Sequence, residues 1–267
     1  MVTNRILSML IMAVVAALPS MARDNGGKSR EVRSTVARGI DAISLSAPVT
    51  VELVPCSGSC DDDGLVSYTT AVADDPLVIS RRGSVLEISA AKTYARGRDM
   101  KIKSSVKVRC GHGIKSVMVS GSGDVKIQRI SVDKDVELSV TGSGDIDVKS
   151  LKAAAVKATV TGSGDIDIKR VAADRTYLVV TGSGDIDAEG SVQKADLTVT
   201  GSGDIDVRKL QTGTMTINLS GSGDVKCESP AELTSQISGS GNITVYGRRP
   251  ARVNLSGNTH NVKFVND

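Results

Sequence analysis

Thr141-Gly142-Ser143-Gly144-Asp145-Ile146-Asp147-Val148 is the stretch that decides the fold, because close copies of it recur down the C-terminal half of the chain. Seven copies of Gly-Ser-Gly followed by Asp or Asn are separated by 18 to 21 residues. A repeat of this period is typical of a solenoid, in which each copy forms one turn that stacks on the previous turn. The copies start at Gly121, Gly142, Gly162, Gly182, Gly201, Gly221 and Gly239.

The residues on both sides of each Gly-Ser-Gly alternate between apolar and polar, which is the period of a β-strand with one buried face. Glycine adopts positive φ angles that other residues adopt only at a cost, and 14 of the 27 glycines belong to these seven corners. With one Phe and no Trp, the core must be a narrow stack of small aliphatic side chains. We therefore predict an all-β fold, a parallel β-helix (solenoid) with about 20 residues per turn, in preference to a hairpin meander or a leucine-rich repeat.

Stacked turns place equivalent residues in columns about 4.8 Å apart. Two aliphatic columns are predicted to fill the core. One contains Val119, Val140, Val160, Val180, Val199, Leu219 and Ile237, and the other contains Val125, Ile146, Ile166, Ile186, Ile205, Val225 and Ile243.

The N-terminus has the pattern of a secretory signal. Residues 1–22 combine Arg5, an apolar run over 6–18 and a small-residue cleavage site at Ser20-Met21-Ala22. The apolar run is too short to favour a membrane span. We therefore predict a signal peptide at 1–22, no transmembrane span in the mature chain, and export to the periplasm or to the extracellular side and cell surface of a bacterium.

The mature chain divides into three parts by its pattern. Residues 23–39 are polar and mixed in charge, and predict a flexible lead-in. Residues 40–110 predict an irregular, strand-rich N-terminal part that caps the open end of the coil, with a degenerate first corner at Ser46-Ala47-Pro48-Val49 and a hairpin turn at Arg81-Arg82-Gly83-Ser84. Residues 111–267 predict the repetitive β-helix.

Tandem Ser/Thr-Gly-Ser-Gly-Asp-Ile/Val copies behind a strand-rich leader and a signal peptide resemble the bacterial auto-transporter adhesin head GIN domain family. The resemblance covers roughly residues 40–263 and is strongest from 117 to 245. It implies a secreted or envelope-associated β-helix without established catalysis, and it offers no catalytic residues to carry over. Cys56 and Cys60, with the acidic run after them, look like a local addition to the family pattern.

The four cysteines of an exported chain are expected to meet an oxidising compartment. Cys56 and Cys60 enclose a flexible Ser-Gly-Ser, and we predict a local disulfide between them; a metal pair there is less favoured because no histidine lies nearby in the sequence. Cys110 and Cys227 lie about five turns apart, beyond disulfide reach, and are predicted to be buried thiols.

Stacking also brings carboxylates together in two columns. One interpretation is structural: an Asp after a glycine corner caps backbone N–H groups of its own turn, and the second column pairs with neighbouring lysines. The alternative is a divalent cation, Ca²⁺, held between neighbouring carboxylates. The candidate metal ligands are Asp145, Asp147, Asp165, Asp167, Asp185, Asp187, Asp204 and Asp206.

The residues favour a binding protein over an enzyme. A net charge of +3 and 2% aromatic residues give no reason to expect nucleic acid. The acids are repeated rather than clustered, His112 and His260 lie at opposite ends of the coil, and no catalytic residue is assigned. We predict a non-catalytic surface or envelope module without a cofactor, with adhesin-like binding of an unidentified surface ligand or envelope component through a repetitive face. The alternatives are a calcium-binding β-helix and, less favoured, a polysaccharide-acting enzyme.

Overall fold

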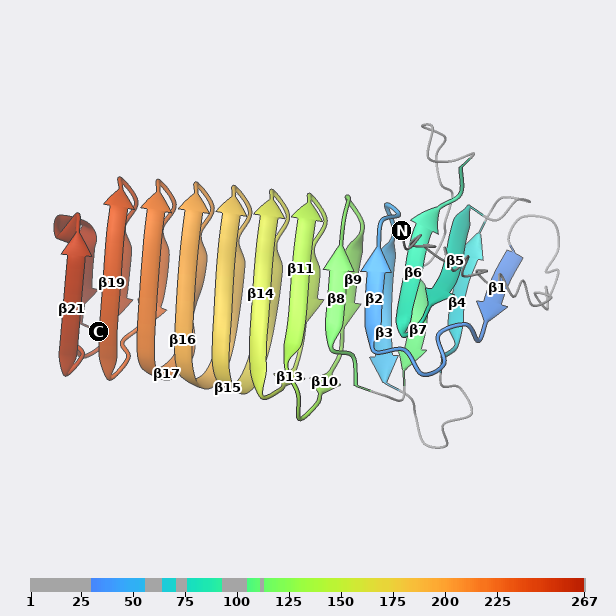
Figure 1. Cartoon of the computed structure of the whole chain (residues 1–267), viewed down its shortest axis with the longest axis horizontal. Helices are drawn as coiled ribbons and strands as arrows, with labels where there is room; N and C mark the ends of the chain where they lie inside the picture. Colours follow the sequence, from blue (N-terminus) through green and yellow to red (C-terminus); the bar gives the residue numbers. More distant parts are fainter. Residues whose placement is uncertain (1–29, 56–63, 71–75, 93–104, 111–112, 267) are drawn as a thin grey trace, which may run out of the picture.

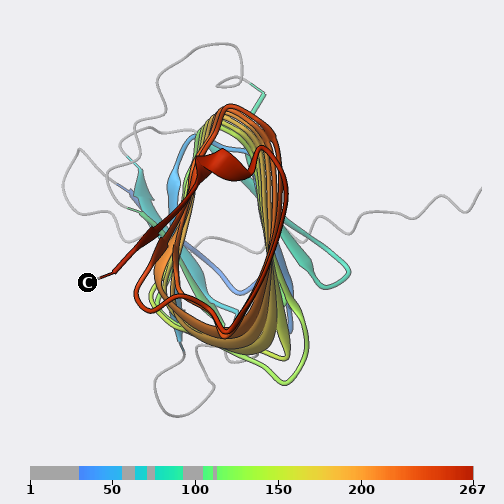
Figure 2. The ribbon, with the colours of Figure 1, turned by 90° about the vertical axis from the view of Figure 1, so that its left-hand side faces the viewer.

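The computed structural model describes residues 30–55, 64–70, 76–92, 105–110 and 113–266. These form a parallel β-solenoid of about 8 turns with about 20 residues per turn, which confirms the predicted fold class (Figure 1). Seen along its axis the coil is a flattened tube with two long sides (Figure 2).

Each regular turn contributes one strand segment to each long side. The sides meet at the Gly-Ser-Gly corner, and β15, β16 and β17 run continuously around the opposite bend. We call the side that leads into the corner the threonine face and the side that leaves it the aspartate face. The threonine face contains β8 (Ser116–Val119), β11 (Val136–Gly142), β14 (Ala155–Gly162), the later halves of β15 (Ile166–Gly182), β16 (Ile186–Gly201) and β17 (Ile205–Gly221), β19 (Glu232–Gly239) and β21 (Arg252–Gly257).

The aspartate face contains the strands that follow each corner. At the far bend two early turns have only the short strands β10 (Ile130–Ser131) and β13 (Leu151–Lys152), which pair with each other in parallel. A 3-10 turn, η2 (Thr259–Asn261), lies in the last turn. The aspartate face is formed by β9 (Asp124–Ile127), β12 (Ile146–Val148), the first halves of β15, β16 and β17, β18 (Val225–Glu228), β20 (Ile243–Tyr246) and β22 (Val262–Val265).

The corners require glycine because successive turns touch there through their backbones. Gly142 has a φ of 130°, and a Cβ added at Gly144 would lie 2.0 Å from the carbonyl oxygen of Gly123 in the turn below. The amides of Ser143 and Gly144 both donate to the carbonyl of Gly121, each at 2.9 Å. The repeat therefore fixes both the bend of one turn and its contact with the next.

The predicted aliphatic columns form the core. Val140 and Ile146 are fully buried, as are their equivalents in the other regular turns, and strands pair in register, Val140 with Val160 and Ile146 with Ile166. Cys227 continues the column of Val207 with 0% exposure, and burial raises the pKa of its thiol to about 12. Cys227 is thus a buried thiol, as predicted, whereas Cys110 is half-buried at the end of β7 (Val106–Cys110), so its predicted full burial is wrong.

The N-terminal part contains a turn of the coil that is out of chain order. β2 (Ala42–Leu45) pairs in parallel with both β6 (Val85–Ala90) and β8, and β3 (Thr50–Pro55) pairs in parallel with both β7 and β9. Residues 46–49 form its corner, which confirms the predicted degenerate first corner. Coil geometry therefore begins before residue 111, because this early segment inserts between two later ones.

Antiparallel strands close this end of the solenoid. β4 (Val66–Thr70) pairs with β7, β1 (Arg30–Ser34) pairs with β4, and β5 (Leu77–Arg82) forms the predicted hairpin with β6. The predicted flexible lead-in is wrong for residues 30–34, because β1 completes the sheet and buries Val32.

Two sequence predictions fall on residues that the structure does not describe. The signal peptide at 1–22 and the Cys56–Cys60 disulfide lie outside the described residues and stay predictions. Among the residues that are described, no helix has the length and apolar character needed to cross a membrane.

Candidate functional site

The first aspartate column links each corner to the next turn. The Oδ1 atom of Asp165 accepts a hydrogen bond from the backbone N–H of Asp185 at 2.8 Å, and Asp145 and Asp185 bond in the same way to the following Asp at 2.9 and 2.7 Å. The prediction that each Asp caps an N–H group of its own turn is therefore wrong. The carboxylate accepts from the N–H of the next turn instead, because the stacked corners bring that group close to it. The column contains Asp124, Asp145, Asp165, Asp185, Asp204 and Asp224.

The two ends of this column show which chemistry the corner needs. Asn242 replaces Asp in the last regular copy, and both its backbone N–H and its side-chain amide donate to Oδ1 of Asp224, at 2.8 and 3.0 Å. At the other end the backbone N–H of Asp124 donates to the carbonyl of Val49 at 3.1 Å. An oxygen acceptor is present in every case, and a charge is not required.

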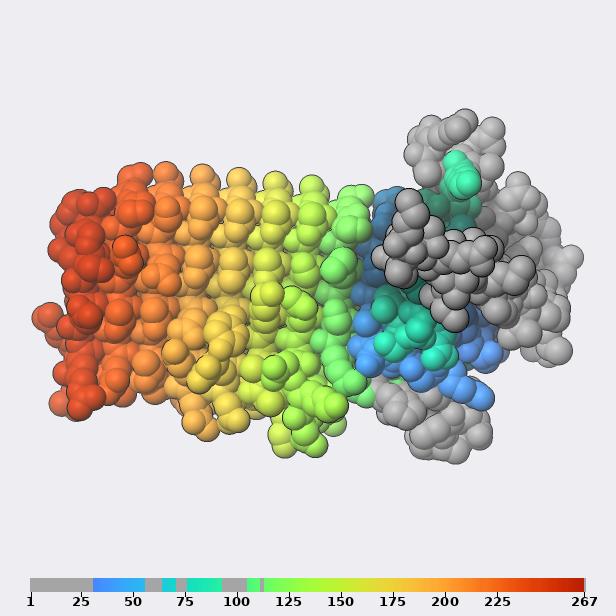
Figure 3. Space-filling model, viewed as in Figure 1, coloured from blue at the N-terminus to red at the C-terminus, as the bar shows by residue number. Residues whose placement is uncertain are grey.

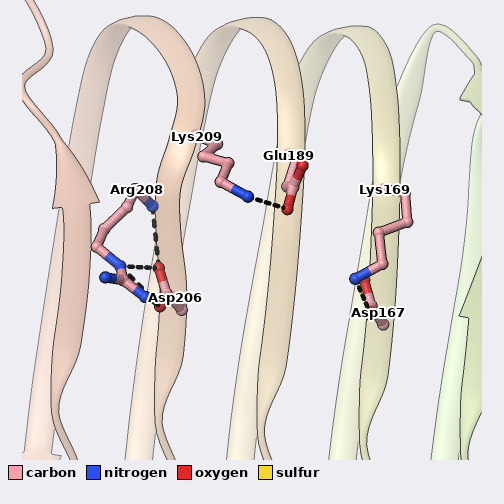
Figure 4. Close-up of polar contacts among 6 residues, drawn as sticks. All are labelled: Asp167, Lys169, Glu189, Asp206, Arg208 and Lys209. Carbon is pink, nitrogen blue, oxygen red and sulfur yellow. Dashed lines mark hydrogen bonds and ion pairs between the residues drawn. The ribbon is translucent and has the colours of Figure 1, made fainter.

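The second aspartate column lies on the aspartate face and is paired with basic residues. Asp147, Asp167, Asp187 and Asp206 align in register, and lysines lie at both ends of the run, Lys126 beside Asp147 and Lys226 beside Asp206. Figure 4 shows three ion pairs on this face: within one turn Lys169 reaches Asp167 at 2.5 Å and Arg208 forms a bidentate pair with Asp206, and between turns Lys209 reaches Glu189 at 3.0 Å.

The carboxylates of this column differ in their proton affinity. Burial raises the pKa of Asp187, and the negative charges of Asp206 and Asp167 raise it further. Burial also raises the pKa of Asp147, against the opposing effect of Lys126. Burial alone would raise the pKa of Asp206 as well, but the hydrogen bonds and charge of Arg208 hold it below its ordinary value.

The eight candidate metal ligands thus fall into the two columns, four in each. One oxygen of each first-column member accepts a backbone N–H, and Lys169 and Arg208 occupy two members of the second column. Within the described ranges no group of three or more His, Cys, Asp or Glu side chains is arranged to hold a metal ion. Calcium binding stays a prediction, which thermal unfolding with excess Ca²⁺ and with a chelator would test.

The threonine column presents its hydroxyls outward. The side chains of Thr141, Thr161, Thr181 and Thr200 are exposed and stacked in register, and their hydroxyls make no hydrogen bond to any described residue. The serines inside the corners are also exposed (Ser143, Ser163, Ser183 and Ser202). Figure 3 shows evenly repeated ridges on the upper part of this face, near the corners. The column has a clear signal in the sequence, because each of these threonines directly follows a buried valine of the core column.

The described part of the chain contains one of the two histidines. His260 is exposed in η2 in the last turn, and His112 lies outside the described residues.

The match to a family model decides the classification. The model described as "Putative auto-transporter adhesin, head GIN domain" matches residues 61–248. This chain belongs to that family. The family match spans the corners from Gly121 to Gly239, so it rests on the same repeat that forms the fold.

Solved structures share the fold at low sequence identity. A crystal structure from Parabacteroides distasonis, described as a putative lipid binding protein, is 22% identical with a TM-score of 0.73, covering 92% of this chain and 97% of that one. A second from the same organism, described as a putative adhesin, is 20% identical with a TM-score of 0.71, covering 90% and 98%. A putative adhesin from Parabacteroides merdae is 18% identical with a TM-score of 0.70, covering 90% and 98%. The search of curated proteins found no match.

Proposed function

We propose that this chain is an exported, non-catalytic surface or envelope module that adheres to its target through the threonine face. The family description and two of the three neighbours above name adhesins, and none of these descriptions names an enzyme. Adhesion by a solenoid suits a target that is itself extended, because many weak contacts along the stack act together.

The observation that carries this proposal is the set of unbonded hydroxyls on the threonine face. A hydroxyl both donates and accepts, so a column of exposed threonines offers both to a ligand at each turn. Equivalent side chains in stacked strands lie about 4.8 Å apart, and the column is rigid because every strand is paired on both sides.

The aspartate face is less suited to this role. Oδ1 of each first-column aspartate is held by a backbone N–H, and two members of the second column are held in ion pairs. A ligand would have to displace those partners, which costs part of the free energy that its own contacts supply. The threonine column thus offers unbonded hydroxyls, whereas the aspartates of the first column and two of those in the second already have partners.

The test is adhesion of bacteria that display the full chain. Cells are allowed to settle on surfaces coated with peptidoglycan, mucin or collagen, and the retained cells are counted after washing. Replacing Thr141, Thr161, Thr181 and Thr200 by Val keeps the shape and strand preference of each side chain but removes its hydroxyl. We expect retention on the preferred surface to fall several-fold.

The matched control changes the same number of residues on the other face. Asp→Asn at the four positions of the second aspartate column should leave retention unchanged. Equal loss in both variants, or none in either, would contradict adhesion through the threonine face. Turnover of an anionic polysaccharide that is lost on changing one acid would instead support the polysaccharide-acting enzyme.

A further inference from the structure

A hollow of about 390 Å³ interrupts the threonine face near the far bend. It lies at the first residues of β11 and β14 and reaches Tyr177 in β15; its other lining residues include Lys115, Asp135, Glu137, Ala155 and Lys157. Everything that lines it belongs to the described part of the chain.

Two departures from the repeat create this hollow. The first departure is a longer turn: the step from Asp124 to Asp145 is 21 residues rather than 20, and residues 132–135 form a loop between β10 and β11. Such a loop projects at the lower edge of the coil in Figure 2. In the next turn the small Ala155 stands in register with Arg175, so the floor of the hollow lacks a long side chain.

The lining combines one aromatic wall with balanced charges. The Tyr177 hydroxyl accepts a hydrogen bond from Arg175 at 3.1 Å, which fixes the position of the ring. Lys157 pairs with Glu137 at 2.9 Å, and Lys115 pairs with Asp41 at 2.8 Å, so neither lysine brings an uncompensated charge. Asp135 is exposed and makes no ion pair with any described residue.

This chemistry fits a sugar ring better than an ion. A pyranose has an apolar C–H face that packs against an aromatic ring and a rim of hydroxyls that both donate and accept hydrogen bonds. The carboxylates of Asp135 and Glu137 accept from such hydroxyls, and the Lys157 ammonium donates to them. An anion would meet the unpaired Asp135, and a small cation would make no use of Tyr177.

We propose that this hollow is a subsite for one neutral sugar unit of a glycan, stacked on Tyr177 and hydrogen-bonded to Asp135, Glu137 and Lys157. The proposal rests on the proposed adhesive function of the threonine face and names the class of ligand that this face would hold. The subsite would fix one unit of the glycan, while the threonine column contacts its continuation along the coil.

The test is titration of the full chain with neutral sugars, followed by NMR saturation transfer. The probes are linear trisaccharides of glucose, galactose, mannose and N-acetylglucosamine, with sialic acid and spermidine as charged comparators. We expect saturable binding of at least one neutral trisaccharide. Tyr177→Thr should weaken that binding about tenfold, because Thr occupies the same column at Thr216 and Thr234 without giving a stacking surface.

Two further variants separate loss of the subsite from loss of the fold. Ala155→Arg fills the hollow with the residue that the next turn carries and should abolish binding while Tyr177 is intact. Its control, Thr214→Arg, lies in the same column two turns beyond Arg175 and should bind normally. Tyr246→Thr makes the tyrosine change on the aspartate face and should also bind normally.

The outcomes distinguish this subsite from the wider function. Absence of binding for every neutral sugar, preference for sialic acid or spermidine, or equal weakening by Tyr177→Thr and Tyr246→Thr would overturn the sugar subsite. If cells with the threonine-to-valine changes lose adhesion while the hollow binds no sugar, the adhesive face stands without the subsite. If sugar binds but those changes leave adhesion intact, the subsite stands without the proposed adhesive face.

Discussion

The regular coil and the N-terminal part use the same strand geometry in different chain order. From β11 to β20 each turn lies between the turns that precede and follow it in the sequence. In the N-terminal part the turn built from β2 and β3 lies between β6 and β7 on one side and β8 and β9 on the other, both later in the chain. Turns can therefore stack in an order that differs from their order in the sequence. In the periodic part of the chain the two orders agree.

The corners of the two regions also differ in their residues and in their hydrogen-bond acceptors. A regular corner uses two glycines and a carboxylate that accepts the next turn's N–H. The corner at 46–49 has no glycine, and a backbone carbonyl, that of Val49, is the acceptor for Asp124. The Gly-Ser-Gly-Asp corner repeats because each copy must pack against an identical copy. The corner at 46–49 packs against a regular corner on one side only.

The largest expected effect comes from filling a regular corner. Gly164→Ala should reduce the free energy of unfolding by about 4 kcal/mol or more, because the added Cβ would lie 2.0 Å from the Gly144 carbonyl oxygen. Gly83→Ala in the N-terminal hairpin has a positive φ but open space around it, and should cost only about 1 kcal/mol. Urea unfolding measures both. Gly213→Ala, with 3.2 Å to the nearest atom and no positive φ, is the control within the coil; similar losses at Gly164 and Gly213 would refute the role of corner contacts.

Core truncation tests whether the inserted turn is coupled only to its neighbours. Leu45→Ala and Leu178→Ala each remove a fully buried side chain and should cost about 3 kcal/mol. Stacked repeats couple mainly to adjacent repeats. Hydrogen exchange should therefore show faster exchange in β6 and β8 for Leu45→Ala, with β19 unchanged. If Leu45→Ala loosens the whole coil evenly, the distinction between the two regions fails.

The carboxylate of the regular corner should matter less than its oxygen. Asp185→Ala removes the acceptor for the Asp204 N–H and should cost about 1 kcal/mol. Asp185→Asn retains an acceptor oxygen and should be nearly neutral, because the uncharged carbonyl of Val49 already serves as the acceptor for the Asp124 N–H. Thermal unfolding of the two variants compares them directly. An equal loss in both would show that the charge itself is required.

The smallest expected effect is a pH dependence within the second aspartate column. Folding raises the pKa of Asp187 above its ordinary value of 3.8, so the folded chain binds the proton more tightly than the unfolded chain. The stability of the fold therefore falls as pH rises from the ordinary pKa to the raised pKa. Asp187→Asn should therefore raise the unfolding midpoint slightly near pH 7 and lose this advantage below the ordinary pKa.

Asp206 gives the opposite sign. Its folded-state pKa is lowered, so its charged form stabilises the fold above the ordinary value, and that contribution is lost as pH falls through the lowered pKa. Asp206→Asn should lower the midpoint near pH 7, with a difference from the parent chain that vanishes in acid. Parallel pH profiles for the two variants would show that the electrostatic difference between them is absent.

Local periodicity made most of the regular coil predictable. The alternation around Val140 and Ile146 identified both core columns, and the recurring Asp145 identified the ladder. The hydrogen-bond partner of each corner carboxylate was not predictable. It is the backbone N–H of the next turn, so it depends on how closely two turns stack and not on the residue spacing within one turn. The sequence did contain one sign of the hollow, the 21-residue step before Asp145. That step alone does not predict a hollow, because Tyr177, which forms its aromatic wall, lies two turns later.

The N-terminal part could not be derived in the same way. Lys115 pairs with Asp41 across 74 residues, and no repeat links the two positions. β1 was missed because its charged residues indicate solvation, whereas the edge of β4 supplies a pairing partner that only the folded chain contains. Contacts between distant, unlike segments leave no periodic trace.

The inserted turn has a consequence for the order in which the chain can assemble. A ribosome releases β2 and β3 early, yet one neighbour of this turn ends at residue 110 and the other at 127. β2 therefore has no lateral partner until β6 (residues 85–90) has been synthesised, and β3 has none until β7 (residues 106–110) has been synthesised. The ladder that follows can grow by adding one turn at a time to an existing template, so the slow step of its assembly lies at its beginning.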